Sequence, residues 1–161
     1  MNWDTLFAMQ KDLDDYITKQ HDLEGQDLIE ERMLALLVEL GELANETRCF
    51  KFWSTKPRSN QETILEEYVD NIHFLLSIGL QKGYEFTYIE VNKIEAAETI
   101  QFNHVFQKCM QFYKDQSESN YIALFQAYLQ LGHLLGFTES DILQAYEKKN
   151  EVNYERQEQG Y

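Results

Sequence analysis

The fold is decided by one stretch, Leu34-Ala35-Leu36-Leu37-Val38-Glu39-Leu40-Gly41-Glu42-Leu43-Ala44-Asn45-Glu46. Apolar residues recur in it at three- and four-residue steps, as they do on one face of an amphipathic helix. Leu36, Leu40 and Leu43 form this apolar stripe. Glu39 and Glu42 flank the stripe, and residues three apart on a helix are neighbours. The two glutamates should therefore lie side by side at the border of the buried face.

A second stretch repeats this arrangement on the next helical segment. Glu67 and Asp70 are again three residues apart, and they border an apolar side made by Ile64, Leu65, Ile72, Leu75 and Leu76. If the two segments pack as antiparallel neighbours, all of these carboxylates can point at one place. His73 follows Asp70 by three residues on the same face.

The remainder of the chain has few helix breakers, with one proline and seven glycines in 161 residues. Helical periodicity extends over residues 3–19, 27–49, 59–82, 87–117, 120–135 and 138 to the C-terminus. Capping patterns pair Asp27 with Glu30, Ser59 with Glu62, Thr87 with Glu90 and Thr138 with Asp141. No stretch alternates as a strand would. We therefore predict an all-α, compact bundle of about six helices in a single domain, residues 1–161.

The charge balance narrows the range of partners. Formal net charge is −14, so the surface repels a nucleic-acid backbone, and we expect no nucleic-acid partner. No segment is apolar for long enough to span a bilayer, and the start lacks a secretion signal, so we expect no membrane partner. The two cysteines have no metal-ligand spacing, which favours free thiols in a reducing cytosol. We expect a soluble, cytoplasmic protein. A protein this acidic would need cations if its ligand carried phosphates.

Converging carboxylates are costly without a cation. Two unit charges about 5 Å apart repel by roughly 3 kcal/mol at an effective dielectric constant near 20. Oxygen ligands favour Mg²⁺ or Mn²⁺ over Zn²⁺, and Mg²⁺ also binds substrate phosphates. Acidic residues at this spacing are equally common on solvated helix faces, so the pattern alone leaves both interpretations open.

Three longer segments carry a family resemblance. Residues 39–53, ending in Phe50-Lys51-Phe52-Trp53, resemble the first metal motif of the dimeric, all-α dUTPases and its trailing Phe-Lys-x-Trp. Residues 66–77 resemble the second metal motif with the His-Phe that follows it, here His73-Phe74. Residues 145–161 resemble the family's Lys-Asn-x-x-Asn-x-x-Arg segment. These dUTPases are related to the MazG-like nucleoside triphosphate pyrophosphohydrolases.

This resemblance implies a bundle with a four-helix core around the metal site, as in the MazG-like all-α pyrophosphatases. It implies Mg²⁺-dependent hydrolysis of dUTP to dUMP and pyrophosphate by a homodimer, with the use of dUDP left open. Glu39, Glu42, Glu67 and Asp70 would hold the metal and form the catalytic centre. One of the glutamates would also activate the attacking water, and we single out Glu42.

The C-terminal segment suits phosphate binding by its own chemistry. Lys149, Asn153 and Arg156 share one helix face, and Asn150 borders it. Their two cations and two amides could clamp phosphates, and Arg156 can donate two parallel hydrogen bonds. Taken alone, these residues are better explained as basic side chains that complement the dipole of a helix end and keep it soluble. The resemblance favours the clamp.

The resemblance also implies that Gln10, Trp53, His73 and Phe74 form the pocket for the uracil base. Taken alone, Trp53 could instead cover the core, and His73 could be a hydrogen-bonded core residue. The chain departs from the Gln-x-x-Leu-Asn of many family members, because Asp14 replaces the asparagine. An ionised carboxylate accepts hydrogen bonds but donates none, whereas uracil O2 and O4 need donors. Asp14 alone can therefore serve only the N3–H of uracil.

Two other functions compete with a dUTP diphosphatase. The aspartate at position 14 favours a MazG-like pyrophosphatase for another or a modified nucleotide. Alternatively, a protein with the dUTPase fold could act by binding a macromolecular partner. The aromatic residues of segments 87–117 and 120–135 could form such an interface, although a core or a dimer contact explains them more simply.

Overall fold

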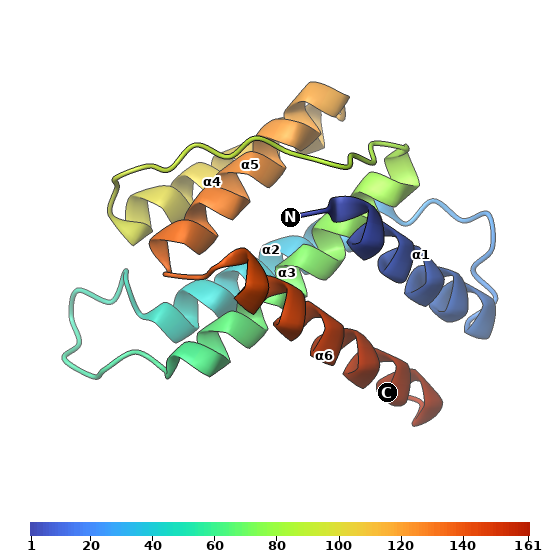
Figure 1. The fold of residues 1–161 in the computed structure, drawn as a ribbon, viewed down its shortest axis with the longest axis horizontal. Coiled ribbons are helices and arrows are strands. Elements are labelled where there is room, and N and C mark those ends of the chain that lie inside the picture. The colour runs from blue at the N-terminus through green and yellow to red at the C-terminus, as the bar shows by residue number, and fades with distance from the viewer.

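The computed structural model, which describes residues 1–161, contains six α-helices and no strand (Figure 1). The helices are α1 (Trp3–Gln20), α2 (Ile29–Thr47), α3 (Gln61–Lys82), α4 (Glu98–Lys114), α5 (Glu118–Leu134) and α6 (Glu139–Glu158). The all-α bundle predicted from the sequence is thereby confirmed. None of the helices combines the length and the apolar character needed to cross a membrane.

The predicted capping box at the start of α6 is present. The side chain of Thr138 accepts the backbone N–H of Asp141, and the Asp141 carboxylate accepts the backbone N–H of Thr138. The predicted start of α3 is one residue early, because Asn60 rather than Ser59 accepts the backbone N–H of Thr63. The Ser59 hydroxyl is engaged elsewhere, since it donates to Glu46 at the end of α2.

α2 also begins later in the chain than predicted. Asp27 does not form a capping box with Glu30. Instead, its carboxylate accepts the backbone N–H of Ile29 at 3.1 Å, and the helix begins there. The chain reaches αL geometry at Arg48, which ends α2 two residues before the predicted limit.

The predicted helix 87–117 is wrong in its first part, because residues 84–97 form an extended connector instead. This connector runs across the bundle to the start of α4 (Figure 1). Long-range hydrogen bonds hold parts of its backbone in place. The Thr87 carbonyl accepts the Trp3 N–H at 3.0 Å, and the Glu90 carbonyl accepts the Gln126 side chain at 2.9 Å. These partners are far away in sequence, and they replace the hydrogen bonds that a helix would have made.

The helices are arranged around the antiparallel pair α2–α3 (Figure 1). The pair α4–α5 packs on one side of it, while α1 and α6 pack against α3 and against each other on the other side. The buried apolar side chains form one continuous cluster that includes residues from every helix. α3 therefore occupies the middle of the bundle, and most of its faces are buried.

Two tyrosines join α3 to α5 on the side away from α1 and α6. The rings of Tyr68 and Tyr128 stack with centroids 4.6 Å apart and planes 10° apart. The Tyr68 hydroxyl donates to the Tyr128 carbonyl at 3.2 Å, and the Tyr128 hydroxyl donates to the Tyr68 carbonyl at 2.7 Å. Gly132 makes room for this pair, because a Cβ atom there would collide with the Tyr68 hydroxyl. Both hydroxyls are buried and satisfied, as stability requires.

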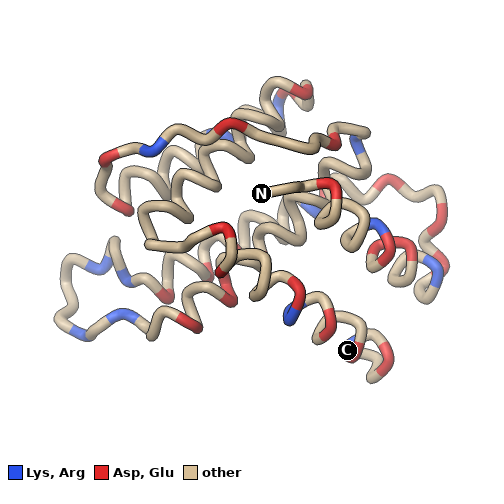
Figure 2. Tube along the Cα trace, viewed as in Figure 1, with Lys and Arg blue, Asp and Glu red and all other residues tan.

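Acidic residues are spread over all the layers of this bundle, whereas basic residues are concentrated in a few places (Figure 2). The loop between α2 and α3 holds four of the 14 basic residues, namely Arg48, Lys51, Lys56 and Arg58. Figure 2 shows this basic loop at the end of the α2–α3 pair, away from the end where α1 meets α2.

Candidate metal and nucleotide site

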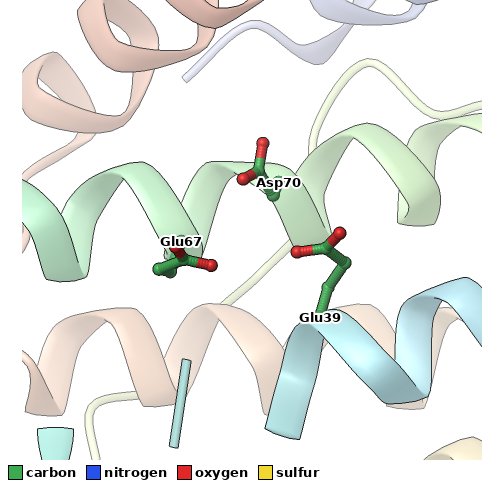
Figure 3. A group of neighbouring side chains, drawn as sticks. All are labelled: Glu39, Glu67 and Asp70. Atoms are coloured by element: carbon green, nitrogen blue, oxygen red, sulfur yellow. The ribbon is translucent and has the colours of Figure 1, made fainter. Parts of the chain in front are cut away.

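Three carboxylates from two helices meet beside the central helix pair. Glu39 comes from α2, and Glu67 and Asp70 come from α3 (Figure 3). One oxygen of each carboxylate lies within 4.8 Å of the others. The three-residue step from Glu67 to Asp70 puts them on one face of α3, and antiparallel packing brings Glu39 opposite them.

The carboxylates disturb one another's ionisation. Burial raises the pKa of Glu39 to about 7, and repulsion by Asp70 and Glu42 adds to the rise. Burial is also the main cause that raises the pKa values of Glu67 and Asp70, and neighbouring carboxylates contribute in both cases. A divalent cation would relieve this repulsion, and an all-oxygen donor set suits a hard ion such as Mg²⁺ or Mn²⁺. The residues present therefore fit a divalent metal.

Two further charged groups lie next to the group formed by the carboxylates of Glu39, Glu67 and Asp70. Glu42 is outside that group, yet it is near enough to repel Glu39, Glu67 and Asp70. Lys149 of α6 donates a 2.8 Å hydrogen bond to Asp70 and lowers the pKa of that carboxyl, partly offsetting the effect of burial.

A cleft of about 410 Å³ opens beside the carboxylates, and helices α1, α2, α3 and α6 form its walls. The family resemblance led us to expect a core of four helices, and these four helices surround the cleft beside the carboxylates. The residues predicted as site residues that line the cleft are Gln10, Glu39, Asp70, His73, Phe74, Asn153 and Arg156. Its volume is in the range of small-molecule sites.

Two of the other residues predicted for the site, Trp53 and Asn150, lie away from the cleft, while Lys149 lies at its acidic edge. Trp53 is 65% exposed in the basic loop, where its ring meets the edges of Phe50 and Phe52, and it does not line the cleft. Asn150 is buried within the bundle at 7% exposure, and its Oδ1 has no hydrogen-bond partner in the protein. Lys149 is directed to Asp70.

The cleft also contains Asp14, which the sequence analysis singled out as a departure from the family pattern, and two groups that it did not, Arg32 and Ser77. Asp14 and Arg32 lie together on its wall, with Asp14 Oδ2 and Arg32 Nη2 3.9 Å apart. Ser77 Oγ donates to Asp14 Oδ1 at 2.9 Å, and Gln10 Nε2 donates to the same oxygen at 2.9 Å. Burial raises the pKa of Asp14, while these hydrogen bonds and Arg32 oppose the rise. No local sequence pattern relates these residues, because they come from three helices.

A family model described as dUTPase matches residues 2–161 of the chain. This protein belongs to the dUTPase family. The resemblance that the motifs carried is therefore confirmed over almost the whole chain, and the all-α fold of this dUTPase family member agrees with it. Membership of the dUTPase family points to a nucleotide pyrophosphohydrolase. A comparison with curated proteins gives no match.

Proposed function

We propose that this protein is a dUTP diphosphatase that hydrolyses dUTP to dUMP and pyrophosphate with the help of Mg²⁺ or Mn²⁺. The observation that carries the proposal is the position of the carboxylate cluster at the edge of a cleft whose other walls hold polar groups. Such a cleft can receive the phosphates at its acidic edge, through a cation, and the nucleoside farther in. Membership of the dUTPase family supports the same conclusion.

In this proposal Glu39, Glu67 and Asp70 hold the metal. When bound, the ion supplies positive charge for the phosphate oxygens and lowers the pKa of a nearby water. Glu42 lies beside these three carboxylates rather than among them, so it is our candidate for the base that takes the proton of the attacking water.

The remaining phosphate contacts come from α6. Arg156 and Asn153 line the cleft, and Lys149 lies at its acidic edge against Asp70. A protein with a net charge of −14 needs such local cations to bind a polyphosphate. Arg156 can donate two parallel hydrogen bonds to one phosphate group, which makes it the stronger anchor of the two basic residues.

Asp14 and Arg32 are the proposed readers of the base. The carboxylate accepts a hydrogen bond and the guanidinium donates, so together they match the N3–H of uracil and one of its neighbouring carbonyl oxygens. Arg32 thus supplies the donor that Asp14 lacks. The same pair could instead meet an amino group and an adjacent ring nitrogen, which keeps a different pyrimidine nucleotide as the second candidate substrate.

We also propose that the protein is a homodimer. An apolar patch on α2 and α4 supports this, with Leu34 64% and Val38 51% exposed on α2, one turn apart. Leu34, Met110 and Tyr113 line a groove between these two helices. Exposed apolar surface of this kind is typical of subunit interfaces.

Two cysteines without a disulfide partner favour a reducing compartment, so we propose the cytoplasm as the location of this protein.

The test is release of pyrophosphate from a panel of ribo- and deoxynucleoside triphosphates with and without Mg²⁺. We expect turnover of dUTP to exceed that of every other nucleotide, and we expect chelation to abolish it. Preferred turnover of another pyrimidine nucleotide would favour the second candidate, and no turnover of any nucleotide would overturn both.

Two neighbouring variants locate the activity in the cluster. Glu67→Gln removes one of the converging carboxylates and should reduce kcat by at least about a hundredfold. Glu66→Gln is the matched control, because Glu66 lies outside the cluster and faces Lys148 on the surface. The two variants should keep the same fold, so equal loss of activity in both would argue against the proposed centre.

A further inference from the structure

Hydrogen-bonded side chains form a network along the wall of the cleft, with Gln10 at its centre. The Tyr146 hydroxyl donates to Gln10 Oε1 at 2.8 Å, and His73 Nδ1 lies 2.7 Å from the same oxygen. On the other side of the amide, Nε2 donates to Asp14 Oδ1 at 2.9 Å and to Ser77 Oγ at 3.0 Å. Both hydrogens and both lone pairs of the Gln10 amide are therefore in use.

The direction of these hydrogen bonds follows from chemistry. The Asp14 carboxylate accepts hydrogen bonds, so the part of Gln10 that faces it must be the NH₂ group. The oxygen of the amide then faces Tyr146 and His73, and an amide oxygen can only accept. His73 must therefore carry its proton on Nδ1. A neutral imidazole has a single N–H, so Nε2 of His73 is left as an acceptor.

The imidazole is held in the neutral form. His73 is 5% exposed, and burial, together with the charge of Lys149, lowers its pKa to about 3. Its Nε2 is buried and has no hydrogen-bond partner in the protein, although His73 lines the cleft. A buried acceptor without a partner is unfavourable unless a ligand satisfies it.

We propose that Tyr146 is a positioning residue, which holds His73 through Gln10 in the Nδ1–H tautomer so that Nε2 accepts a hydrogen bond from an N–H or O–H group of the bound nucleotide. The proposal rests on the proposed nucleotide-binding function of the cleft. Tyr146 has a second hold on the imidazole, because the two rings stack with centroids 4.2 Å apart and planes 20° apart. Tyr146 itself is fully buried, so it acts on the ligand only through its neighbours.

This role separates Tyr146 from the other buried tyrosines. The hydroxyl groups of Tyr68, Tyr121 and Tyr128 all donate to backbone carbonyls, which fixes helices but orients no side chain. The hydroxyl of Tyr146 donates instead to a side-chain amide that can turn over. The Leu6 carbonyl lies 3.5 Å from the same hydroxyl, which is longer than a normal O–H···O hydrogen bond.

The experiment compares Tyr146→Phe with Tyr121→Phe. The first variant keeps the stacked ring and removes only the hydroxyl that holds Gln10. The second removes an equally buried hydroxyl, which donates at 2.8 Å to the Leu75 carbonyl and does not touch the cleft. Nitrogen-15 NMR of the imidazole, recorded without nucleotide and with dUMP, reports which ring nitrogen carries the proton. Steady-state kinetics with dUTP reports KM and kcat separately.

We expect wild-type His73 to be protonated on Nδ1 and its Nε2 signal to shift when dUMP binds. In Tyr146→Phe, Gln10 loses one of the two hydrogen bonds to its oxygen, while Asp14 and Ser77 still hold its NH₂ group. We therefore expect a measurable increase in the Nε2–H tautomer and a KM several-fold higher, with kcat within about twofold, because the hydrogen bond to the ligand is weakened. Tyr121→Phe should leave the tautomer and KM unchanged. Wild-type protonation on Nε2, or an equal rise in KM for both variants, would overturn the proposal. Lack of turnover with dUTP would count against the proposed function only, because the tautomer is measured without catalysis.

Discussion

The ammonium nitrogen of Lys149 lies 2.8 Å from Asp70 Oδ2, and each of the two side chains is only 17% exposed. A residue predicted to bind phosphate is thus paired with a carboxylate predicted to bind metal. The pair offsets part of the repulsion among the carboxylates, because Lys149 favours the ionised form of Asp70. A divalent ion bound by the three carboxylates would compete with this ammonium group for the carboxylate of Asp70. Binding of the ion should therefore release Lys149 toward the phosphates.

Replacing Lys149 with methionine tests this competition. We expect Lys149→Met to bind Mg²⁺ several-fold more tightly than the wild type when no nucleotide is present, because Asp70 is then unpaired. The KM for dUTP should rise about tenfold or more, because a phosphate contact is lost. Titration calorimetry with Mg²⁺ measures the first effect and steady-state kinetics the second.

Lys148→Met is the matched control for this variant, because Lys148 is 66% exposed and pairs only with surface glutamates. It should change neither Mg²⁺ affinity nor KM by more than about twofold. Unchanged Mg²⁺ binding in Lys149→Met would contradict the competition.

The raised pKa of Glu39 predicts a pH-dependent gain in stability for Glu39→Gln in metal-free protein. The folded-state pKa of about 7 lies above the ordinary value of 4.5, so the folded state binds the proton more tightly than the unfolded state. The charged carboxylate therefore destabilises the fold above about pH 7, and this cost disappears as pH falls toward 4.5. Because Glu39 is partly exposed, we expect a gain of only about 1 kcal/mol at pH 8.

Urea unfolding of wild type and Glu39→Gln at pH 8 and pH 5, in the presence of a chelator, measures this difference. The variant should be the more stable protein at pH 8, and the two should converge at pH 5. A constant difference at both pH values would show that Glu39 ionises without hindrance. Adding Mg²⁺ at pH 8 should reverse the order, because only the wild type keeps the complete carboxylate group.

Gly132 lies against the tyrosine pair and Gly41 lies in open space, so alanine should have opposite effects on stability at these two positions. Gly132→Ala should reduce the free energy of unfolding by about 1–3 kcal/mol, because its Cβ would collide with the Tyr68 hydroxyl. Gly41→Ala should increase it by about 0.5–1 kcal/mol, because Gly41 is helical and has no atom near its Cβ position. Thermal and urea unfolding distinguish the two. Equal effects would mean that the tyrosine pair has room to shift.

Introducing a charge into the apolar patch tests the proposed dimer. Val38→Glu should convert a dimer to a monomer in sedimentation experiments, because a carboxylate buried in an interface is strongly unfavourable. The fold of the single chain should be kept, since Val38 is 51% exposed there. A wild type that sediments as a monomer, or a variant that remains dimeric, would exclude this patch as the interface.

The helices and the carboxylate group could be predicted from the sequence because both depend on local spacing. The step from Glu67 to Asp70 places two carboxylates on one helix face, and the pairing with Glu39 follows from packing consecutive helices side by side. The sequence failed at residues 84–97, where Thr87 and Glu90 suggest a helix start. Distant partners from α1 and α5 hold that segment extended instead.

The cleft wall could not be predicted, because its order comes from contacts between residues far apart in sequence. The resemblance assigned Gln10 to the base pocket without indicating its neighbours, and Tyr146 and His73 contact its oxygen from 136 and 63 residues away. The sequence placed no hydrogen-bond donor for a base next to Asp14. Arg32 lies beside Asp14 because α1 and α2 both border the cleft. Spacing rules within one helix contain no information about such neighbours.

The tyrosine pair between α3 and α5 has a consequence for motion. Tyr68 and Tyr128 fix the back of α3 by exchanging hydrogen bonds, so the helix that carries Glu67 and Asp70 cannot easily slide or turn. The backbones of α1 and α6 pack mainly against α3 and against each other, with side-chain contacts from α1 to α2 and α5 at Asp14 and Trp3. Closure of the cleft on a nucleotide should therefore be a movement of α1 and α6 against a stationary α3, with the tyrosine pair as its fixed point.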